Sequence, residues 1–330
     1  MSEFALIDVL RARCAQARDD VVLGIGDDAA LSTVPPGRQL VSCTDTLLAG
    51  VHFLPDTAPE DIGWKALAVN LSDLASMGAE PAWALLALTL PEADTGFVER
   101  FADGFVELAR AHDIALIGGD TTQGPLSVTV TALGFVPIGA ALTRAGARAG
   151  DVVFVTGMLG DAAGALALSL PPLAGEGARS AVFSPEGGWG QLLKRLNRPE
   201  PRIAAGLALR DLARACIDVS DGLLADLGHV CTASNVGAEI EADALPISPE
   251  LTASFDAQTR RDLALAGGDD YELCFTAPAE REATIVKALD RAGCGATRIG
   301  RIVAGSGVRV VDSHGNVIAT PRAGWEHFSR

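Results

Sequence analysis

Aspartates recur along most of the chain, each in a short segment rich in Gly, Ser or Thr that follows an apolar run. Carboxylate oxygens suit hard cations such as Mg2+, which are often shared with the phosphates of a substrate. No cluster of His or Cys accompanies these acids in the sequence. The pattern therefore predicts a magnesium and nucleotide site built from some of the following residues: Asp27, Asp28, Asp45, Asp73, Asp120, Asp218, Asp221, Asp269 and Asp270.

Each of these acids also has a simpler interpretation. Asp favours turns and helix N-caps, so any single one could have only a local backbone role. Within each of the two adjacent pairs, Asp27–Asp28 and Asp269–Asp270, the carboxylates repel one another unless a bound cation offsets the repulsion. Asp73 differs because it lies within a predicted helix, where it shares a face with Asn70 and Met77. A solvated helix face explains that arrangement equally well.

The usual phosphate-binding motifs are missing from the sequence, which has no GxxxxGK[ST] and no complete GxGxxG. The junction from Thr156 to Asp161 could hold an anion at a helix N-terminus, although plain chain topology is the simpler interpretation. Arg144 could contact a nucleotide phosphate or be a solvated linker charge. His52 and Trp325 could be packed side chains rather than ligands. None of these features identifies a function alone.

Composition excludes several classes of protein. A formal net charge of -16 and a pI near 4.7 argue against a nucleic-acid or anionic-membrane surface, because both attract basic patches. The N-terminus lacks a basic region leading into an apolar stretch, and the apolar runs are too short to span a bilayer. The six cysteines form no CxxC pair. We therefore expect a cytoplasmic protein with reduced thiols.

A length of 330 residues predicts two domains around separate cores. The first, residues 1–140, is expected to be α+β with a mostly sequential sheet. In this scheme Asp45 and Asp120 follow the ends of strands. The predicted elements are helices over residues 4–14, 60–77 and 95–111, and strands over residues 21–25, 40–43, 83–90, 114–117 and 126–135.

The segment 141–150 is small, basic and turn-forming, and we interpret it as a linker. The second domain, residues 151–330, alternates strands with helices and is expected to be α/β. A Gly- and Pro-rich stretch over residues 171–190 is expected to be a surface loop. The predicted elements are strands over residues 152–156 and 216–219, and helices over residues 161–170, 203–214 and 222–233.

An ordered set of segments gives a more specific signal than any single motif. They are GIGDDAAL, SCTDTLLAGVHFLPD, KALAVNLSDLASMGAEPAW, LIGGDTTQGPLSVTVTALGFVP, ALTRAGARAGD, IDVSDGLLADLGH, GGDDYELCF and AGWEHF. Together they resemble the thiamine-monophosphate kinase family, which is part of the aminoimidazole-ribonucleotide-synthetase-like superfamily. The resemblance covers nearly the whole chain and misses mainly the predicted loop.

This resemblance implies an N-terminal α/β domain whose sheet pairs with that of a second subunit to form a shared β-barrel, and a C-terminal α/β domain. It implies a homodimer that uses ATP and several Mg2+ ions to phosphorylate thiamine monophosphate by in-line transfer. By motif position, the expected metal ligands are Asp28, Thr44, Asp45, Asp73, Asp120, Asp218 and Asp221. The expected ATP contacts are Gly119, Asp120, Arg144 and Ser220, and the expected substrate contacts are His52, Asp269 and Trp325.

The chain departs from the family pattern at two positions. Cys43 stands where Ser or Thr is usual, and a soft thiol is a poor magnesium ligand. Asp269 stands where Glu is more common, so its carboxylate is one methylene shorter.

The acceptor chemistry is consistent with a site that has acids and no obvious catalytic His. A phosphate acceptor is largely dianionic near neutral pH and needs no general base. Two alternatives stay open. One is another enzyme of the superfamily, such as the cyclo-ligase that makes aminoimidazole ribonucleotide, or selenophosphate synthetase. The other is a non-catalytic metal–nucleotide sensor.

Overall fold

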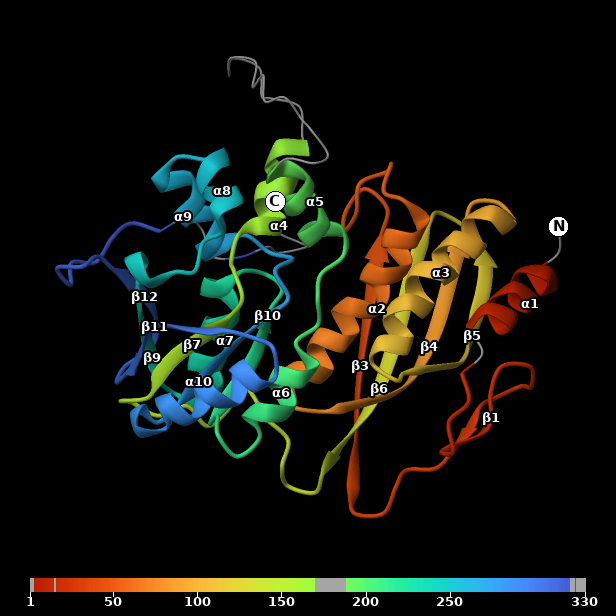
Figure 1. The fold of residues 1–330 in the computed structure, drawn as a ribbon, viewed down its shortest axis with the longest axis horizontal. Coiled ribbons are helices and arrows are strands. Elements are labelled where there is room, and N and C mark those ends of the chain that lie inside the picture. The colour runs from red at the N-terminus through yellow and green to blue at the C-terminus, as the bar shows by residue number, and fades with distance from the viewer. Residues whose placement is uncertain (1–2, 15, 170–187, 321–323, 325–330) are drawn as a thin grey trace. The chain divides into compact units, whose positions relative to one another are not determined.

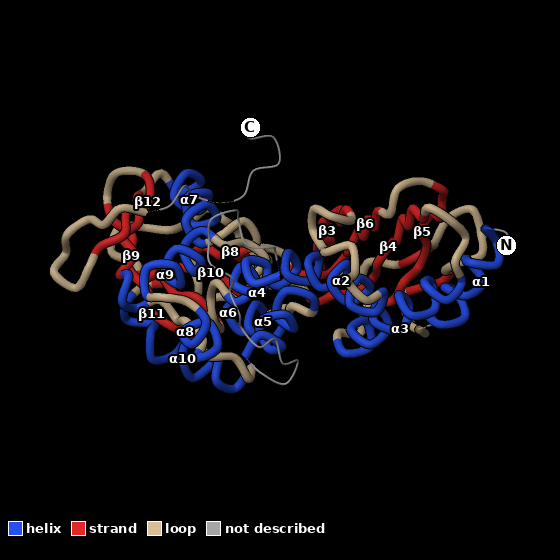
Figure 2. Tube along the Cα trace, turned by 90° about the horizontal axis from the view of Figure 1, so that it is seen from above, coloured by secondary structure: helices blue, strands red, loops and turns tan. Residues whose placement is uncertain are grey.

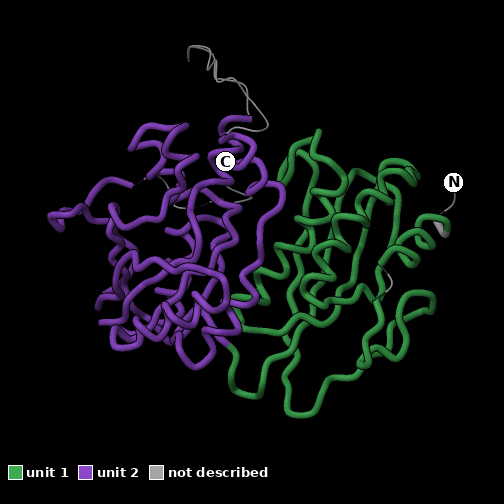
Figure 3. The backbone as a smooth tube through the Cα atoms, viewed as in Figure 1, with its two compact units in different colours: residues 1–141 green, residues 142–330 purple. Residues whose placement is uncertain are grey.

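The computed structural model describes residues 3–14, 16–169, 188–320 and 324. The chain divides into two compact units, Met1–Ala141 and Leu142–Arg330 (Figure 3). Each unit has its own mixed sheet and its own buried apolar core. The predicted two-domain α/β class is therefore confirmed. Among the residues described, every helix is too short or too polar to cross a membrane.

The first unit is built on a four-stranded sheet in the order β3-β6-β4-β5 (Figure 1). The prediction of a sequential sheet is wrong, because β6 lies between β3 and β4, and β5 runs parallel to β4 after the crossover helix α3. Its elements are α1 (Glu3–Cys14), β1 (Val21–Leu23), β2 (Leu31–Ser32), β3 (Arg38–Leu48), α2 (Pro59–Ser76), β4 (Glu80–Leu90), α3 (Thr95–Ala111), β5 (Ala115–Gln123) and β6 (Ser127–Pro137).

The described helices of this unit all lie on one face of its sheet. Figure 2 shows α1, α2 and α3 together on one side of the four strands. Over residues 41–48 of β3, exposed side chains alternate with less exposed ones, as expected for a sheet with one packed face. On the other face Leu40, Leu48 and Leu85 are exposed large apolar residues, and Leu85 is 36% exposed. We call this side the open face.

Two glycines bring α2 and α3 into backbone contact. A Cβ atom on Gly63 would lie 2.0 Å from the carbonyl oxygen of Phe101, and one on Gly104 would lie 1.8 Å from the carbonyl oxygen of Glu60. No side chain fits at either position. The buried rings of Phe101 and Phe105 stack beside this contact. This packing fixes the position of α2, and therefore that of Asp73 near its C-terminal end.

Two strands of the first unit are longer than predicted. β3 continues past residue 43 to Leu48, and β5 continues past residue 117 to Gln123. The prediction ended both strands where polar residues and glycines replace the apolar run. Ladder pairing with β6 and β4 nevertheless continues through these polar residues, and Thr44, Thr46 and Asp120 among them lie on the open face, where side chains need not be apolar. Asp45 and Asp120 therefore lie inside strands, not after them.

The second unit has a six-stranded sheet in the order β12-β9-β11-β7-β10-β8. The strands β7, β8 and β10 are buried along their whole length, as expected for a sheet with both faces covered. Figure 2 shows α7 on one side of it and α6 and α10 on the other. Its strands are β7 (Val152–Thr156), β8 (Ala215–Val219), β9 (Gly237–Glu241), β10 (Glu272–Ala277), β11 (Ala296–Val303) and β12 (Gly307–Val311).

The helices of the second unit differ from prediction at two points. The helix expected over residues 203–214 ends at Leu209, and the amide of Arg214 instead donates to the carbonyl of Thr276 beside β10. The loop expected over residues 171–190 overlaps the start of α5, and the rest of it lies outside the described residues. The helices are α4 (Asp161–Ser169), α5 (Gly188–Asn197), α6 (Ile203–Leu209), α7 (Leu223–Ser234), α8 (Pro249–Ser254), α9 (Ala257–Ala266) and α10 (Glu282–Arg291).

Candidate active site

The first group of predicted ligands lies where β3 faces α2. Asp45 shares the helix-facing side of β3 with Cys43, and Asp73 lies near the C-terminal end of α2. Burial raises the pKa of the Cys43 thiol far above its ordinary value, and the nearby carboxylates of Asp73 and Asp45 raise it further. The structure therefore brings Asp45 and Asp73 into one neighbourhood, around the same thiol.

The Cys43 thiol has a defined role in this neighbourhood. Its Sγ lies 3.3 Å from the carbonyl oxygen of Asn70 and donates to it. A thiol with a raised pKa stays protonated, and only the thiolate is a metal ligand. Cys43 is thus a packing and hydrogen-bonding residue between the two acids.

Thr44 points the other way. Its hydroxyl lies on the open face, where it donates to the carbonyl of Val130 at 3.2 Å and lies 3.0 Å from the hydroxyl of Thr131. Successive residues of a strand project to opposite faces of a sheet. The structure therefore does not bring the Thr44 side chain together with Asp45.

Asp120 also lies on the open face. The strand register places it in one row with Thr46 and Thr129, across the sheet from β3 to β5. Asp45 and Asp120 are on opposite faces and three strand spacings apart, which amounts to about 14 Å. Within one subunit these two carboxylates do not meet. Gly119 packs so tightly that a Cβ there would lie 1.8 Å from the carbonyl oxygen of Leu86.

His52 lies in a tight turn directly after β3. Its Nδ1 accepts a hydrogen bond from the amide of Leu48 at 3.0 Å, and its carbonyl accepts one from Nζ of the buried Lys65 at 2.9 Å. The imidazole ring is therefore held by the backbone of the turn. Asp28 lies exposed in the turn between β1 and β2, where its amide donates to the carboxylate of Asp27 at 2.8 Å.

The second group of predicted ligands lies at the junction of β8 and α7. Asp218 is buried in β8, and Ser220 and Asp221 form the loop before the helix. Gly222 has a φ of 109°, a backbone conformation that favours glycine.

Asp226, in the first turn of α7, holds this loop in place. Its Oδ2 accepts the amides of Ser220 at 3.0 Å and Asp221 at 3.1 Å. Burial, and then the carboxylates of Asp218 and Asp221, raise the pKa of Asp226 to about 7. We did not predict a role for Asp226. The sequence signal for this role is a third acid after Asp218 and Asp221, at a spacing that places it in the first turn of the helix, within reach of the preceding loop.

The turn of residues Asp269, Asp270 and Tyr271, which we call the acidic turn, lies beside this loop. The amide of Asp269 donates to the carbonyl of Ser220 at 2.9 Å, and that of Tyr271 to the carbonyl of Val219 at 2.8 Å. Asp269 and Tyr271 have φ values of 67° and 50°. Left-handed backbone costs about 1–3 kcal/mol at each such residue. The Tyr271 hydroxyl donates to the Asp269 carboxylate at 3.0 Å.

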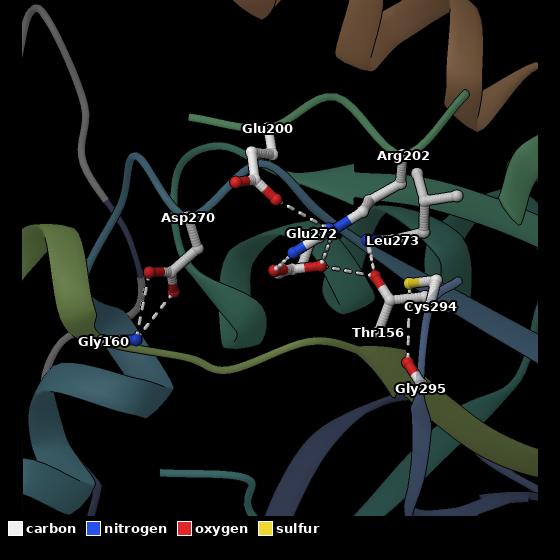
Figure 4. Close-up of polar contacts among 9 residues, drawn as sticks. All are labelled: Thr156, Gly160, Glu200, Arg202, Asp270, Glu272, Leu273, Cys294 and Gly295. Carbon is white, nitrogen blue, oxygen red and sulfur yellow. Dashed lines mark hydrogen bonds and ion pairs between the residues drawn. The ribbon is translucent and has the colours of Figure 1, made fainter. Parts of the chain in front are cut away.

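The Asp270 carboxyl group accepts the hydrogen bond of the Gly160 amide at the start of α4 (Figure 4). Its Oδ2 and Oδ1 lie 2.9 and 3.0 Å from the amide nitrogen of Gly160. Burial raises the pKa of Asp270 well above its ordinary value, and the Gly160 amide acts in the opposite direction. The anion position that the sequence suggested at this helix is therefore filled by a carboxyl group of the chain itself.

Two predicted contacts lie apart from these groups. The carbonyl of Arg144 accepts from the hydroxyl of Ser234, at the end of α7 opposite to Ser220. A helix of that length measures about 18 Å, so Arg144 and Ser220 cannot hold the same phosphate group. Trp325 lies outside the described residues. Within the described ranges of either unit, no group of three or more His, Cys, Asp or Glu is arranged to hold a metal ion.

Comparison with known proteins covers both units. Residues 26–136 match the model described as AIR synthase related protein, N-terminal domain, and residues 148–313 match its C-terminal domain. The thiamine-monophosphate kinase of Escherichia coli strain K12 is 47% identical over 327 residues, which are 99% of this chain and 98% of that protein.

Two solved structures are similar over nearly the whole chain. The crystal structure of thiamine-monophosphate kinase from Stenotrophomonas maltophilia K279a is 53% identical with a TM-score of 0.85, and the match covers 96% of this chain and 98% of that one. A structure described as AaThiL complexed with AMPPCP and TMP is 33% identical with a TM-score of 0.76, covering 99% and 97%.

Proposed function

The chain belongs to the thiamine-monophosphate kinase family, and from this premise we propose that it transfers the terminal phosphoryl group of ATP to the phosphate of thiamine monophosphate. The products are thiamine diphosphate and ADP. The observation that carries the proposal is the 47% identity to the Escherichia coli thiamine-monophosphate kinase over 327 residues, which span both units. The AaThiL complex with TMP and AMPPCP, an ATP analogue, supports the same pair of substrates.

The reaction depends on neutralising the negative charge of its two substrates more than on proton transfer. The acceptor phosphate is largely dianionic near neutral pH, because its second pKa is about 6. The difficulty is the repulsion between two polyanions, and in-line transfer proceeds once they are aligned and their charge is neutralised. The site residues are accordingly assigned to binding and orientation, and none to general base catalysis.

The residues present fit Mg2+ as the source of that neutralisation. The acids on β3, on α2, on β5 and at the β8–α7 junction offer the hard oxygen donors that Mg2+ prefers. We assign metal binding to Asp28, Asp45, Asp73, Asp120, Asp218 and Asp221. When bound, Mg2+ would neutralise charge on the transferring phosphoryl group.

The other assignments follow the family positions. Gly119 and Ser220 would contact ATP, and Arg144 would contact a part of it remote from Ser220. His52 and Asp269 would orient thiamine monophosphate, together with Trp325. The Asp269 carboxylate accepts a hydrogen bond from the Tyr271 hydroxyl, which fixes its direction.

The active unit would be a homodimer whose barrel forms from two open faces. Two observations support this. The open face leaves large apolar side chains exposed, among them Leu40, Leu48 and Leu85, which is what an unpaired interface looks like. In addition, Asp45 and Asp120 are on opposite faces of one sheet, so one ion could contact both only if the second copy supplied one of them.

An assay of ADP release tests the function directly. Thiamine monophosphate, free thiamine and an aminoimidazole precursor would be compared as acceptors with the same enzyme and Mg-ATP. We expect turnover with thiamine monophosphate only, because a hydroxyl acceptor needs a base that the site does not provide. Comparable turnover of free thiamine would contradict the mechanism. Binding of ATP without any ADP release would favour the sensor instead.

A further inference from the structure

The acidic turn requires external support to keep its shape. Two left-handed residues, Asp269 and Tyr271, are separated by only one residue. For a bulky side chain such as tyrosine this conformation is rare, and it persists only where the surrounding structure enforces it. The amides of both residues are bound by β8 and the following loop, and Asp270 is bound by Gly160. These contacts hold the start and middle of the turn.

Glu272 holds its C-terminal end (Figure 4). The carboxylate is only 2% exposed and receives two hydrogen bonds from the guanidinium of Arg202, from Nε at 2.7 Å and from Nη2 at 2.6 Å. The Thr156 hydroxyl donates to the same carboxylate at 2.7 Å and accepts the amide of Leu273 at 2.8 Å. A bidentate pair of this kind fixes direction as well as charge.

The carboxylate packs directly against the backbone of Gly157. A Cβ on Gly157 would lie 1.9 Å from Oε1 of Glu272. Arg202 itself is mostly buried, with its side chain 14% exposed. The pair therefore lies under the acidic turn and does not form the surface that a substrate would touch.

We propose that the Arg202–Glu272 ion pair is a positioning pair, which fixes the acidic turn so that Asp269 meets the thiamine end of the substrate. This rests on the proposed function, in which Asp269 contacts thiamine monophosphate. The pair acts through the backbone of the adjoining turn. Loosening it should change recognition of thiamine monophosphate while leaving ATP binding intact.

The chain supplies a matched control. Arg214 and Asp151 form a second ion pair in the same unit at 2.5 Å, and Asp151 is also 2% exposed. Asp151 directly precedes β7 and Arg214 directly precedes β8, whereas Thr156 is the last residue of β7. Arg214→Lys replaces a guanidinium that bonds to a buried carboxylate, as Arg202→Lys does, but remote from the acidic turn.

The experiment compares Arg202→Lys, Glu272→Gln and Arg214→Lys by steady-state kinetics, melting temperature and NMR. Tyr271 is the only tyrosine of the chain, so a ring-labelled tyrosine gives one signal from within the acidic turn. We expect both variants of the positioning pair to raise KM for thiamine monophosphate about ten- to a hundredfold. Their KM for ATP should stay near wild type, and the Tyr271 signal should shift or broaden. Arg214→Lys should lower the melting temperature without either effect.

Thr156→Val is the second variant, because it removes the hydroxyl that donates to the Glu272 carboxylate and keeps both charges. It should move the Tyr271 signal and KM in the same direction. Unchanged KM and an unchanged Tyr271 signal in folded variants would overturn the proposal, as would an equal response in Arg214→Lys. If wild-type enzyme fails to phosphorylate thiamine monophosphate, the proposed function fails, and the Tyr271 signal still tests whether the pair shapes the turn.

Discussion

The two sheets of this chain carry their acids in different ways. In the first unit, helices cover one face only, and the acids of β3 and β5 are distributed over both faces. In the second unit both faces are covered, and the acids gather in loops at one end of β8 and β10. Asp45 and Asp120 of the first sheet can share one ion only with help from another surface, whereas the second unit presents its acids together from loops.

The most severe test of this contrast is a charge on the open face. Leu85→Arg places a guanidinium where two copies are proposed to meet, and an unpaired buried charge is strongly unfavourable. We expect loss of the dimer in light scattering and a fall in turnover on the order of a thousandfold, since charge stabilisation of the transition state would be lost. Val286→Arg on α10 is the control, because Val286 is similarly exposed at 38%. A fully active Leu85→Arg monomer would refute the shared site.

Removing one charge from the first unit should have a smaller effect. Asp45→Asn keeps the shape of the side chain and removes a metal-binding charge, so turnover should fall on the order of a hundredfold. Part of this loss should return at high magnesium, because mass action refills a weakened site. Stability without metal should not decrease. Near-normal turnover at limiting magnesium would mean that Asp45 is not a ligand.

In the second unit, the loop before α7 can be loosened without touching an assigned ligand. Asp226→Ala leaves the amides of Ser220 and Asp221 without their acceptor, which should cost about 1–3 kcal/mol of unfolding free energy. KM for ATP should rise about tenfold, as expected from a small misplacement of a binding loop. Asp226→Asn keeps an acceptor oxygen and should be milder in both measurements. Equal kinetics in the two variants would show that loop placement is unimportant.

The smallest expected effect concerns pH and the first unit. Burial lowers the pKa of His112, at the end of α3, below the ordinary value of 6.5. The unfolded chain therefore binds a proton there before the folded chain does, and the contribution of neutral His112 to stability is lost as pH falls below about 6.5. Denaturant titrations of wild type and His112→Gln between neutral pH and about pH 5 should show a shallower decline in the variant. Parallel curves would contradict the assignment.

Local patterns predicted much of the fold. The helices α2, α3 and α7 and the strand β7 were predicted to within a few residues, because apolar spacing and Pro or Gly boundaries mark them. The sheet order was not predicted, because it depends on which strands pair across the chain. The strand ends near Asp45 and Asp120 were wrong for a related reason, since an open face carries polar residues without ending the ladder.

The site was predictable as a set of residues and not as an arrangement. Motif positions gave the acids, but not that Thr44 and Asp45 face opposite ways or that Arg144 lies a helix length from Ser220. The supporting residues Asp226, Arg202 and Glu272 lacked a sequence signal strong enough to separate them from ordinary charged positions. Their partners lie close in space only because the strands β7, β8 and β10 are neighbours.

Backbone amides at two helix starts of the second unit are already bonded to the chain's own carboxyl groups. Asp270 accepts a hydrogen bond from the amide at the start of α4, and Asp226 accepts hydrogen bonds from the two amides before α7. Helix starts are the places where a bare anion usually binds. Under the proposed function, free nucleotide would meet amide donors that are already bonded, and a nucleotide that brings its own cation would bind through the remaining acids. The same feature that shapes the loops would make the chain select the magnesium complex of ATP and disregard simple oxyanions such as sulfate.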